Sequence, residues 1–189
     1  MSYLVDALTL IVQMAFGAIA TLFLVRLLAE ANRADFHNPL SQFVYRYTNP
    51  ILSPIRRVLP NWRRINLAAV LILLLTFVLE RLVLSVLMGF VPAWLGLLVL
   101  SLADLLNFVL LFYIVVIFGW SLLSMFAPDP YHPLYRLAGT IVEPLLRPLR
   151  GKLVVGSIDF SPTVVVILLL LAQRLIAAPL FDFGASLAR

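Results

Sequence analysis

Four long apolar runs constrain this chain more than any other feature. They cover residues 4–28, 67–90, 97–126 and 161–181. Crossing a bilayer core takes about 20 mostly apolar residues in a helix, and backbone groups in lipid must be satisfied within such a helix. The 189 residues are 63% hydrophobic and only 12% charged, which is too little charge to cover a soluble domain. We therefore expect an all-α membrane protein with four transmembrane helices.

The basic residues predict how these helices are oriented. Residues 29–66 and 127–160 lie on one side of the predicted membrane, and the opposite side has only Arg189. Cytoplasmic loops are enriched in Lys and Arg, so both long segments are expected in the cytoplasm, with both termini and the short turn at Pro92 outside. The first run is longer than the apolar core of a signal peptide, so we expect it to be retained. The ten cations are Arg33, Arg46, Arg56, Arg57, Arg63, Arg64, Arg136, Arg147, Arg150 and Lys152.

The chain contains an internal duplication, with units predicted at 1–93 and 94–189. At an offset of 94 residues, Asn-Pro-Ile-Leu-Ser-Pro-Ile-Arg (49–56) aligns with Glu-Pro-Leu-Leu-Arg-Pro-Leu-Arg (143–150). At the same offset Asn38-Pro39-Leu40 aligns with His132-Pro133-Leu134, and one deletion later Glu80-Arg81 aligns with Gln173-Arg174. Each unit reads helix, basic segment, helix, and so returns the chain to its starting side. The two hairpins should therefore form a parallel repeat rather than an inverted one.

This twice-repeated Pro and Arg pattern resembles the YggT family of small bacterial and plastid membrane proteins, in its two-repeat form. The resemblance covers essentially the whole chain, although His132 replaces Asn38 and Gly151 stands where Arg57 would recur. It implies a multi-pass protein of the bacterial inner (plasma) membrane. It also implies links to osmotic stress tolerance, cell division and, in plastids, thylakoid complex assembly. The family offers no catalytic residues to carry over.

Each basic segment should begin with a short amphipathic helix in the membrane interface. Asn38 is a suitable N-cap with Pro39 at the first helical position, and apolar residues follow at i, i+3, i+4 and i+7 in 40–47. The same spacing recurs in 134–141. Because proline lacks an amide N–H, we expect Pro50 and Pro144 to end these helices.

The Pro-rich basic segments are the candidate binding surface. Basic residues beside a membrane helix attract anionic lipid by about 1 kcal/mol each. Topology with lipid anchoring, a docking site for a protein partner and a phosphate site all fit this pattern. The lipid- or partner-binding candidates are Asn38, Pro39, Pro50, Pro54, Arg56, Arg57, His132, Pro133, Pro144, Arg147, Pro148 and Arg150.

A second candidate site consists of polar residues inside the spans. Arg81 and Asp104 stand at similar distances from Pro92, so we expect them to pair. We also expect Glu80 to pair with Arg174, and Gln13 with Asn107. Such groups either fix the register of packed helices or line a path for ions. The intramembrane candidates are Glu80, Arg81, Asp104, Gln173 and Arg174.

No pattern in the sequence indicates an enzyme. The chain has no cysteine and two histidines, and it lacks phosphate-loop, zinc-protease and serine-hydrolase motifs. We expect no cofactor and no nucleic-acid partner. The expected function is a non-enzymatic membrane scaffold or assembly protein, whose basic cytoplasmic face contacts anionic lipid and an unidentified protein. The resemblance connects it with cell division or envelope and osmotic stress. The alternative is a small ion channel or transport protein of osmotic stress resistance, acting as a homo-oligomer.

Overall fold

The computed structural model describes residues 3–126, 129, 131–155 and 158–188. Within these residues four helices are long and apolar enough to cross a membrane, as predicted. The first three are α1 (Tyr3–Ala31), α3 (Leu67–Leu87) and α4 (Trp94–Met125). The fourth is a continuous rod of α6 (Ser161–Ala172), the π-helix η1 (Gln173–Ala177) and α7 (Ala178–Leu187). The chain is thus a multi-pass helical protein.

The helix ends differ from the predicted spans by a few residues. The first and last helices extend to Ala31 and Leu187, beyond the predicted ends at 28 and 181, because helical geometry continues past the apolar run. In contrast, α3 ends at Leu87 instead of residue 90. Gly89 follows with φ of 79°, a left-handed conformation that glycine adopts readily and that stops a helix. Arg189 lies outside the described residues.

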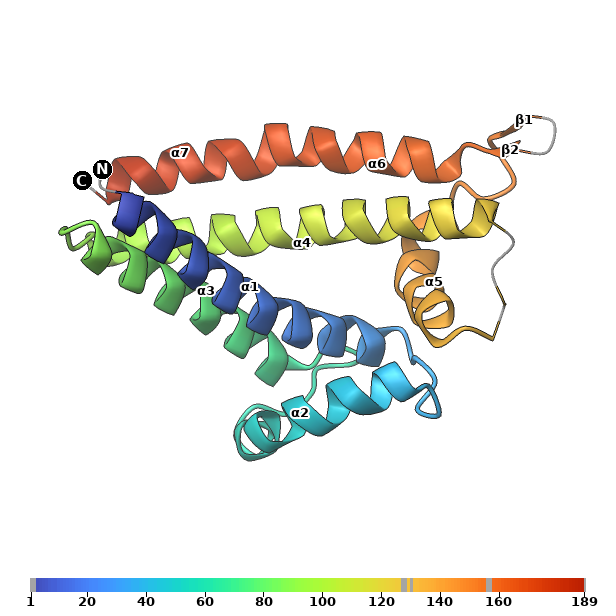
Figure 1. The fold of residues 1–189 in the computed structure, drawn as a ribbon, viewed down its shortest axis with the longest axis horizontal. Helices are drawn as coiled ribbons and strands as arrows, with labels where there is room; N and C mark the ends of the chain where they lie inside the picture. The colour runs from blue at the N-terminus through green and yellow to red at the C-terminus, as the bar shows by residue number, and fades with distance from the viewer. Residues whose placement is uncertain (1–2, 127–128, 130, 156–157, 189) are drawn as a thin grey trace.

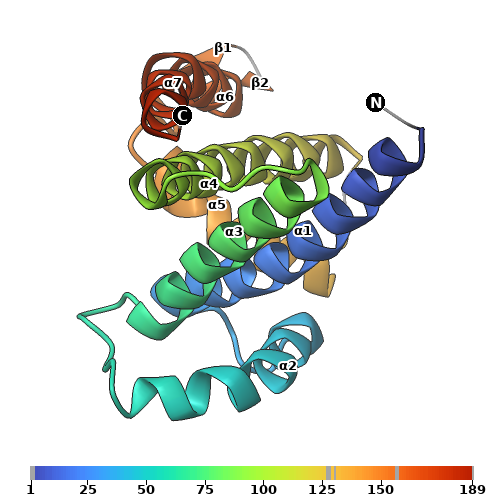
Figure 2. The ribbon, with the colours of Figure 1, turned by 90° about the vertical axis from the view of Figure 1, so that its left-hand side faces the viewer.

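The helices are arranged around α4. Figures 1 and 2 show α4 between the α1/α3 pair on one side and the α6–α7 rod on the other. Phe23 of α1 and Leu73 of α3 form one buried cluster with Leu52, and Ile117 of α4 forms another with Val165 of α6. The start of α1 and the end of α7 lie at the same end of the molecule, opposite to α5 (Figure 1).

Each connecting segment contains a helix, but prolines do not end it. Helix α2 runs Pro39–Arg56 through Pro50 and Pro54, and α5 runs Pro133–Leu146 through Pro144. The predicted ends at Pro50 and Pro144 are therefore wrong. Both prolines are exposed, so the carbonyl that loses its amide partner stays accessible to other donors, and the helix tolerates the loss.

The two segments begin and continue differently. The Asn38 side chain accepts a hydrogen bond from the Leu40 amide at 2.9 Å, which confirms the predicted cap. His132 occupies the same position before α5 but caps nothing with its side chain. After α5 the chain forms a short antiparallel hairpin of β1 (Val154–Val155) and β2 (Ile158–Asp159), which the sequence did not predict. Hydrogen bonds from the Ser161 side chain and amide lower the pKa of Asp159.

Gly96 allows α4 and the end of α7 to approach closely. A Cβ at this position would clash with the backbone of Ala188, whereas a Cβ at Gly119 on the same helix would meet open space. We expect Gly96→Ala to cost about 1–3 kcal/mol, because backbone cannot rotate away from the added methyl. Gly119→Ala is the matched control, and it should leave stability unchanged or raise it through helix propensity. Detergent-induced unfolding of both variants tests this, and equal midpoints would contradict it.

Candidate functional site

A buried polar cluster joins the first three helices, and we call it the junction centre. It consists of Arg26 and Glu30 of α1, Arg56 at the end of α2, and Asn66, which caps α3. Arg56 donates to the Glu30 carboxylate from Nη2 at 2.6 Å, and Asn66 donates to it from Nδ2 at 2.8 Å. The Arg26 Nε lies 3.4 Å from the same carboxylate. The Glu30 carboxylate therefore accepts hydrogen bonds from α2 and from the cap of α3, and it also forms an ion pair with Arg26 of its own helix.

Arg26 is the most enclosed member of the junction centre. Its side chain is 1% exposed, and its Cζ lies 3.3 Å from the centroid of the Tyr45 ring. Its Nη2 also donates to the Asn49 side chain at 3.1 Å. Stacking on the ring and pairing with Glu30 together offset part of the cost of burying a guanidinium. Burial in turn raises the pKa of Tyr45, although the nearby Arg26 opposes that shift.

Of the junction centre, only Arg56 was among the candidate residues predicted from the sequence. The available signal was the i, i+4 spacing of Arg26 and Glu30 at the end of the first apolar run. At the aligned positions of the second half, Trp120 replaces Arg26 and Gly139 replaces Tyr45. Trp120 stacks on Tyr135 at 5.6 Å, and a Cβ at Gly139 would lie 3.2 Å from the Trp120 Nε1. In the second half, Trp120 beside Gly139 thus replaces the Arg26–Tyr45 pair. The two halves therefore differ in charge at this position.

A second polar group, the intramembrane centre, connects α3, α4 and η1. Arg81 donates to both oxygens of Asp104, from Nη2 at 2.8 Å and from Nε, which confirms the predicted pair. The Arg81 Cζ also lies 4.9 Å from the ring centroid of Phe181. Gln173 donates to Asn107 at 3.0 Å. The Arg81–Asp104 and Gln173–Asn107 hydrogen bonds each join two helices and so fix the register of those helices.

Two predicted pairs of this centre are wrong. Asn107 bonds to Gln173 instead of Gln13, because the neighbour of α4 at this depth is η1. Glu80 and Arg174 form no ion pair with each other among the described residues; the α3 residue that reaches the rod is Arg81, at Phe181 of α7. Arg174 is exposed within its span, and Glu80 is half-buried.

A polar groove lies between α4 and the α6–α7 rod. It has a volume of about 600 Å³ and is only partly enclosed. The π-helix forms part of its wall. Pro179 has no amide N–H to donate, which explains why the hydrogen-bond ladder shifts just before it. Its polar and aromatic lining comes from Asp104, Asn107, Gln173, Arg174 and Phe181.

The start of α2 contacts the start of α5. Asn38 donates from Nδ2 to the Pro133 carbonyl at 2.8 Å, and Arg136 reaches Asp35 at 3.2 Å. Hydrogen bonds from the backbone and side chain of His37 hold the pKa of Asp35 below its usual range. A small cavity of about 150 Å³ lies beside these residues. The predicted candidates Asn38 and Pro133 thus meet.

The other predicted surface candidates remain apart. Arg56 turns inward to the junction centre, whereas Arg57 next to it is exposed. Arg150 pairs with Glu143 at 2.6 Å on the surface of the second half. The remaining candidates are exposed or at the helix starts, namely Pro39, Pro50, Pro54, His132, Pro144, Arg147 and Pro148. In the described ranges no three His, Cys, Asp or Glu side chains gather as metal ligands would.

The chain matches one protein family in comparison with known proteins. The CCB3/YggT family model matches residues 5–87 and again residues 99–180. The chain is 32% identical to the uncharacterized protein YggT of Escherichia coli K12, over 96% of this chain and 95% of that protein. It is 33% identical to an uncharacterized protein of Pseudomonas aeruginosa, over 81% of this chain and 79% of that protein. No solved structure matches the chain.

Proposed function

We infer a function from the premise that this chain belongs to the CCB3/YggT family and crosses the membrane several times. We propose that it is a non-enzymatic scaffold, in which the outer face of α2 binds anionic lipid and a protein partner. The observation that carries this proposal is the set of large apolar side chains that α2 leaves exposed.

Helix α2 has two different faces. Ser41, Val44, Thr48 and Leu52 are buried against the bundle. Phe43, Tyr47 and Ile51 form a stripe at i, i+4 and i+8 and are about half exposed, at 54%, 56% and 48%. The predicted single stripe that joined Val44 to Phe43 and Tyr47 is therefore divided between the core and the surface. Exposed aromatic side chains of this kind are typical of interfaces with proteins or with lipid headgroups.

Helix α5 does not offer a comparable surface. Its apolar residues Leu137, Ile141, Val142 and Leu146 are all buried in the bundle. Only Leu134, near its start, is a large apolar residue with half of its surface exposed. The second half therefore uses its connecting helix for packing, whereas the first half leaves a face free. The proposed binding function belongs to α2.

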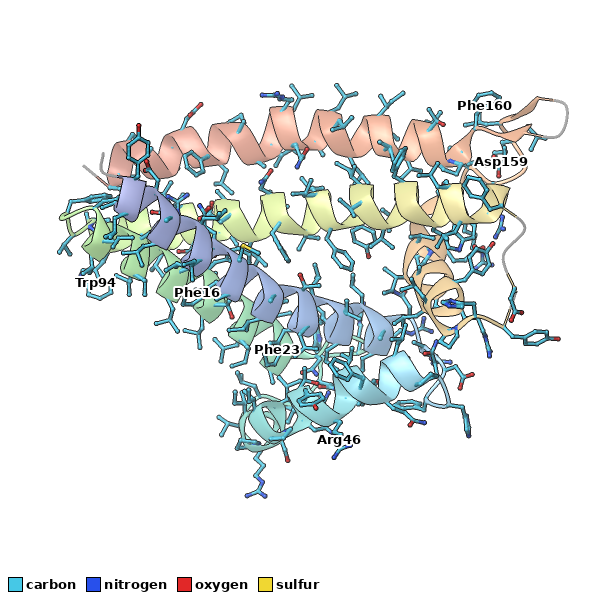
Figure 3. All side chains as sticks on the ribbon, in the orientation of Figure 1. Phe16, Phe23, Arg46, Trp94, Asp159 and Phe160 are labelled. Atoms are coloured by element: carbon cyan, nitrogen blue, oxygen red, sulfur yellow. The ribbon has the colours of Figure 1, made fainter. Side chains whose placement is uncertain are left out.

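Basic residues border the exposed face of α2. Arg46 lies on the outer side of the helix (Figure 3), and Arg57, Arg63 and Arg64 follow it along the exposed chain. Trp62 is 62% exposed among them. Arginine beside exposed aromatic side chains suits an anionic lipid surface, and a partner with acidic residues suits it equally. We place this face in the cytoplasm of a bacterial cell, with both termini on the other side of the inner membrane, on the strength of the ten cations in the two long segments.

The ion-channel alternative has less support. Of the five intramembrane candidates, Arg81 and Asp104 engage each other fully, and Gln173 is bonded to Asn107. Groups paired in this way stabilise helix contacts instead of coordinating a moving ion. The family resemblance favours a role in an assembly for cell division or envelope stress, and the α2 face provides the surface for it.

Photo-crosslinking in cells tests the scaffold proposal. A benzophenone amino acid at Tyr47 is expected to give a discrete protein adduct, because that side chain lies in the centre of the exposed stripe. The matched control places the same probe at Leu134, which is 50% exposed on α5. Replacing Phe43 and Ile51 by Ser should remove the Tyr47 adduct while membrane insertion persists. Identical adducts at both sites, or none at Tyr47, would count against a scaffold.

A further inference from the structure

We propose that a second copy of this chain lays its α1 into the polar groove between α4 and the α6–α7 rod. The groove is only partly enclosed, and its polar lining residues Asp104, Asn107, Gln173 and Arg174 all lie within helices long and apolar enough to cross a membrane. Polar groups in hydrocarbon normally face protein or water. The groove is therefore incomplete in the single chain. This inference is independent of the α2 surface.

The first half of the chain shows how such a position is covered. Arg81 and Phe77 of α3 pack against Asp104 and Phe108 of α4, which is the first helix of the second half. Phe77 is 6% exposed as a result, and the Phe77 and Phe108 ring centroids lie 5.4 Å apart. The helix that covers this face of α3 is thus the first helix of the next half. For the second half, the corresponding helix is α1 of another copy.

The residues at the aligned positions in the second half and in α1 are all exposed. Leu170 and Arg174 align with Phe77 and Arg81, and both line the groove. Leu10 and Met14 of α1 align with Asp104 and Phe108. Leu170, Leu10 and Met14 are 47%, 58% and 67% exposed. The surfaces that would repeat the α3–α4 contact are therefore present and free.

Charge supports the same partner. Arg174 is exposed in its span and has no ion pair among the described residues. Where Asp104 would recur, α1 has Leu10, but Asp6 stands one helical turn earlier on the same face and is exposed. Arginine is long enough to reach a carboxylate displaced by one turn. An Arg174–Asp6 pair between copies would replace the Arg81–Asp104 pair within the chain.

The arrangement can close upon itself. When the rod of one copy receives α1 of its partner, a twofold axis lets the partner's rod receive α1 of the first copy. Two copies would then bring four helical hairpins together, with each groove covered once. The partner copy contributes the acid that Arg174 lacks.

Cysteine crosslinking tests this contact cleanly, because the chain contains no cysteine. Met14→Cys and Leu170→Cys are placed on two copies with different tags, which are expressed together and oxidised in native membranes. A disulfide-linked band carrying both tags is expected. The control pairs Met14→Cys with Leu168→Cys, which is 54% exposed but points to another side of α6. A band from the control as strong as that from Leu170, or no band from Leu170 with both cysteines labelled and inserted, would overturn the proposal.

A charge exchange tests the ion pair in the same assay. Arg174→Asp is expected to abolish the mixed-tag band, and adding Asp6→Arg should restore it. Restoration requires a contact between these two positions, which a general loss of folding cannot produce. If the cysteine band persists in Arg174→Asp, the proposed pairing with Asp6 is wrong. Failure of either assay would leave the photo-crosslinking result on α2 unaffected, so the two proposals are separable.

Discussion

Glu30→Ala is expected to lower the free energy of unfolding by about 3–5 kcal/mol, the cost of removing one partner from a buried ion pair. Glu30 accepts hydrogen bonds from Arg56 and Asn66 in the junction centre, and it forms an ion pair with Arg26. Its removal would leave the guanidinium of Arg26, which is 1% exposed, without its acid and in contact with the Tyr45 ring and the Asn49 side chain. The loss should release α2 from α1 and α3, because Arg56 belongs to α2.

The matched control is Glu143→Ala. Glu143 pairs with Arg150 at 2.6 Å, but both side chains are substantially exposed, at 42% and 51%. Exposed pairs contribute less than about 1 kcal/mol because water screens them. Detergent-induced unfolding, followed by the accessibility of a cysteine introduced at Val44, would report both global stability and the release of α2. Equal effects from the two substitutions would show that the junction centre does not depend on burial.

Asp104→Leu is expected to destabilise the bundle by a similar amount, about 3–5 kcal/mol. The carboxylate accepts two hydrogen bonds from Arg81 within the spans, and its loss would leave a guanidinium without its acid beside hydrocarbon. In the double variant Arg81→Leu/Asp104→Leu no charge remains unpaired. Its stability should therefore recover most of the loss, since apolar replacement of a whole buried pair is close to neutral.

A double-mutant cycle measures this coupling. Unfolding free energies of the wild type, both single variants and the double variant give the interaction energy directly. We expect a strongly non-additive cycle, with the double variant more stable than Asp104→Leu alone. An additive cycle would mean that Arg81 and Asp104 stabilise the helices independently. Leu102→Ala, an exposed position on the same helix, provides a control for general effects in α4.

Some of the contacts could be predicted because they depend only on how far apart two residues are along the chain. Arg81 and Asp104 were expected to meet because two helices joined by a short turn place residues at equal distances from that turn side by side. The cap at Asn38 was predictable because it involves only the next two residues. The ends of α2 and α5 were predicted wrongly, since the cost of a proline depends on whether the released carbonyl is buried. Whether this carbonyl is buried depends on how the helix packs, and the local sequence does not reveal the packing.

The junction centre shows the limit of local reasoning most clearly. Arg26 belongs to α1, Tyr45 and Arg56 belong to α2, and Asn66 precedes α3. Each alone is an ordinary polar residue. Only the packing of α2 and α3 against α1 brings Arg56 and Asn66 to Glu30 and the Tyr45 ring to Arg26. The wrong pairing of Glu80 with Arg174 has a similar origin, because an alignment of the two halves does not reveal which side chains face each other in the bundle.

The sequence by itself determined the four spans, the family of the chain and the common side on which both connecting segments lie. Hydropathy, length and composition are properties of the linear chain, so they do not depend on how the helices pack. The tertiary structure alone decided which face of α2 is buried, which acids meet which arginines, and that a polar groove remains open beside Arg174. The physical reason is that burial and charge pairing depend on distances between helices. Those distances follow from how side chains of every helix pack together, and no single segment encodes them.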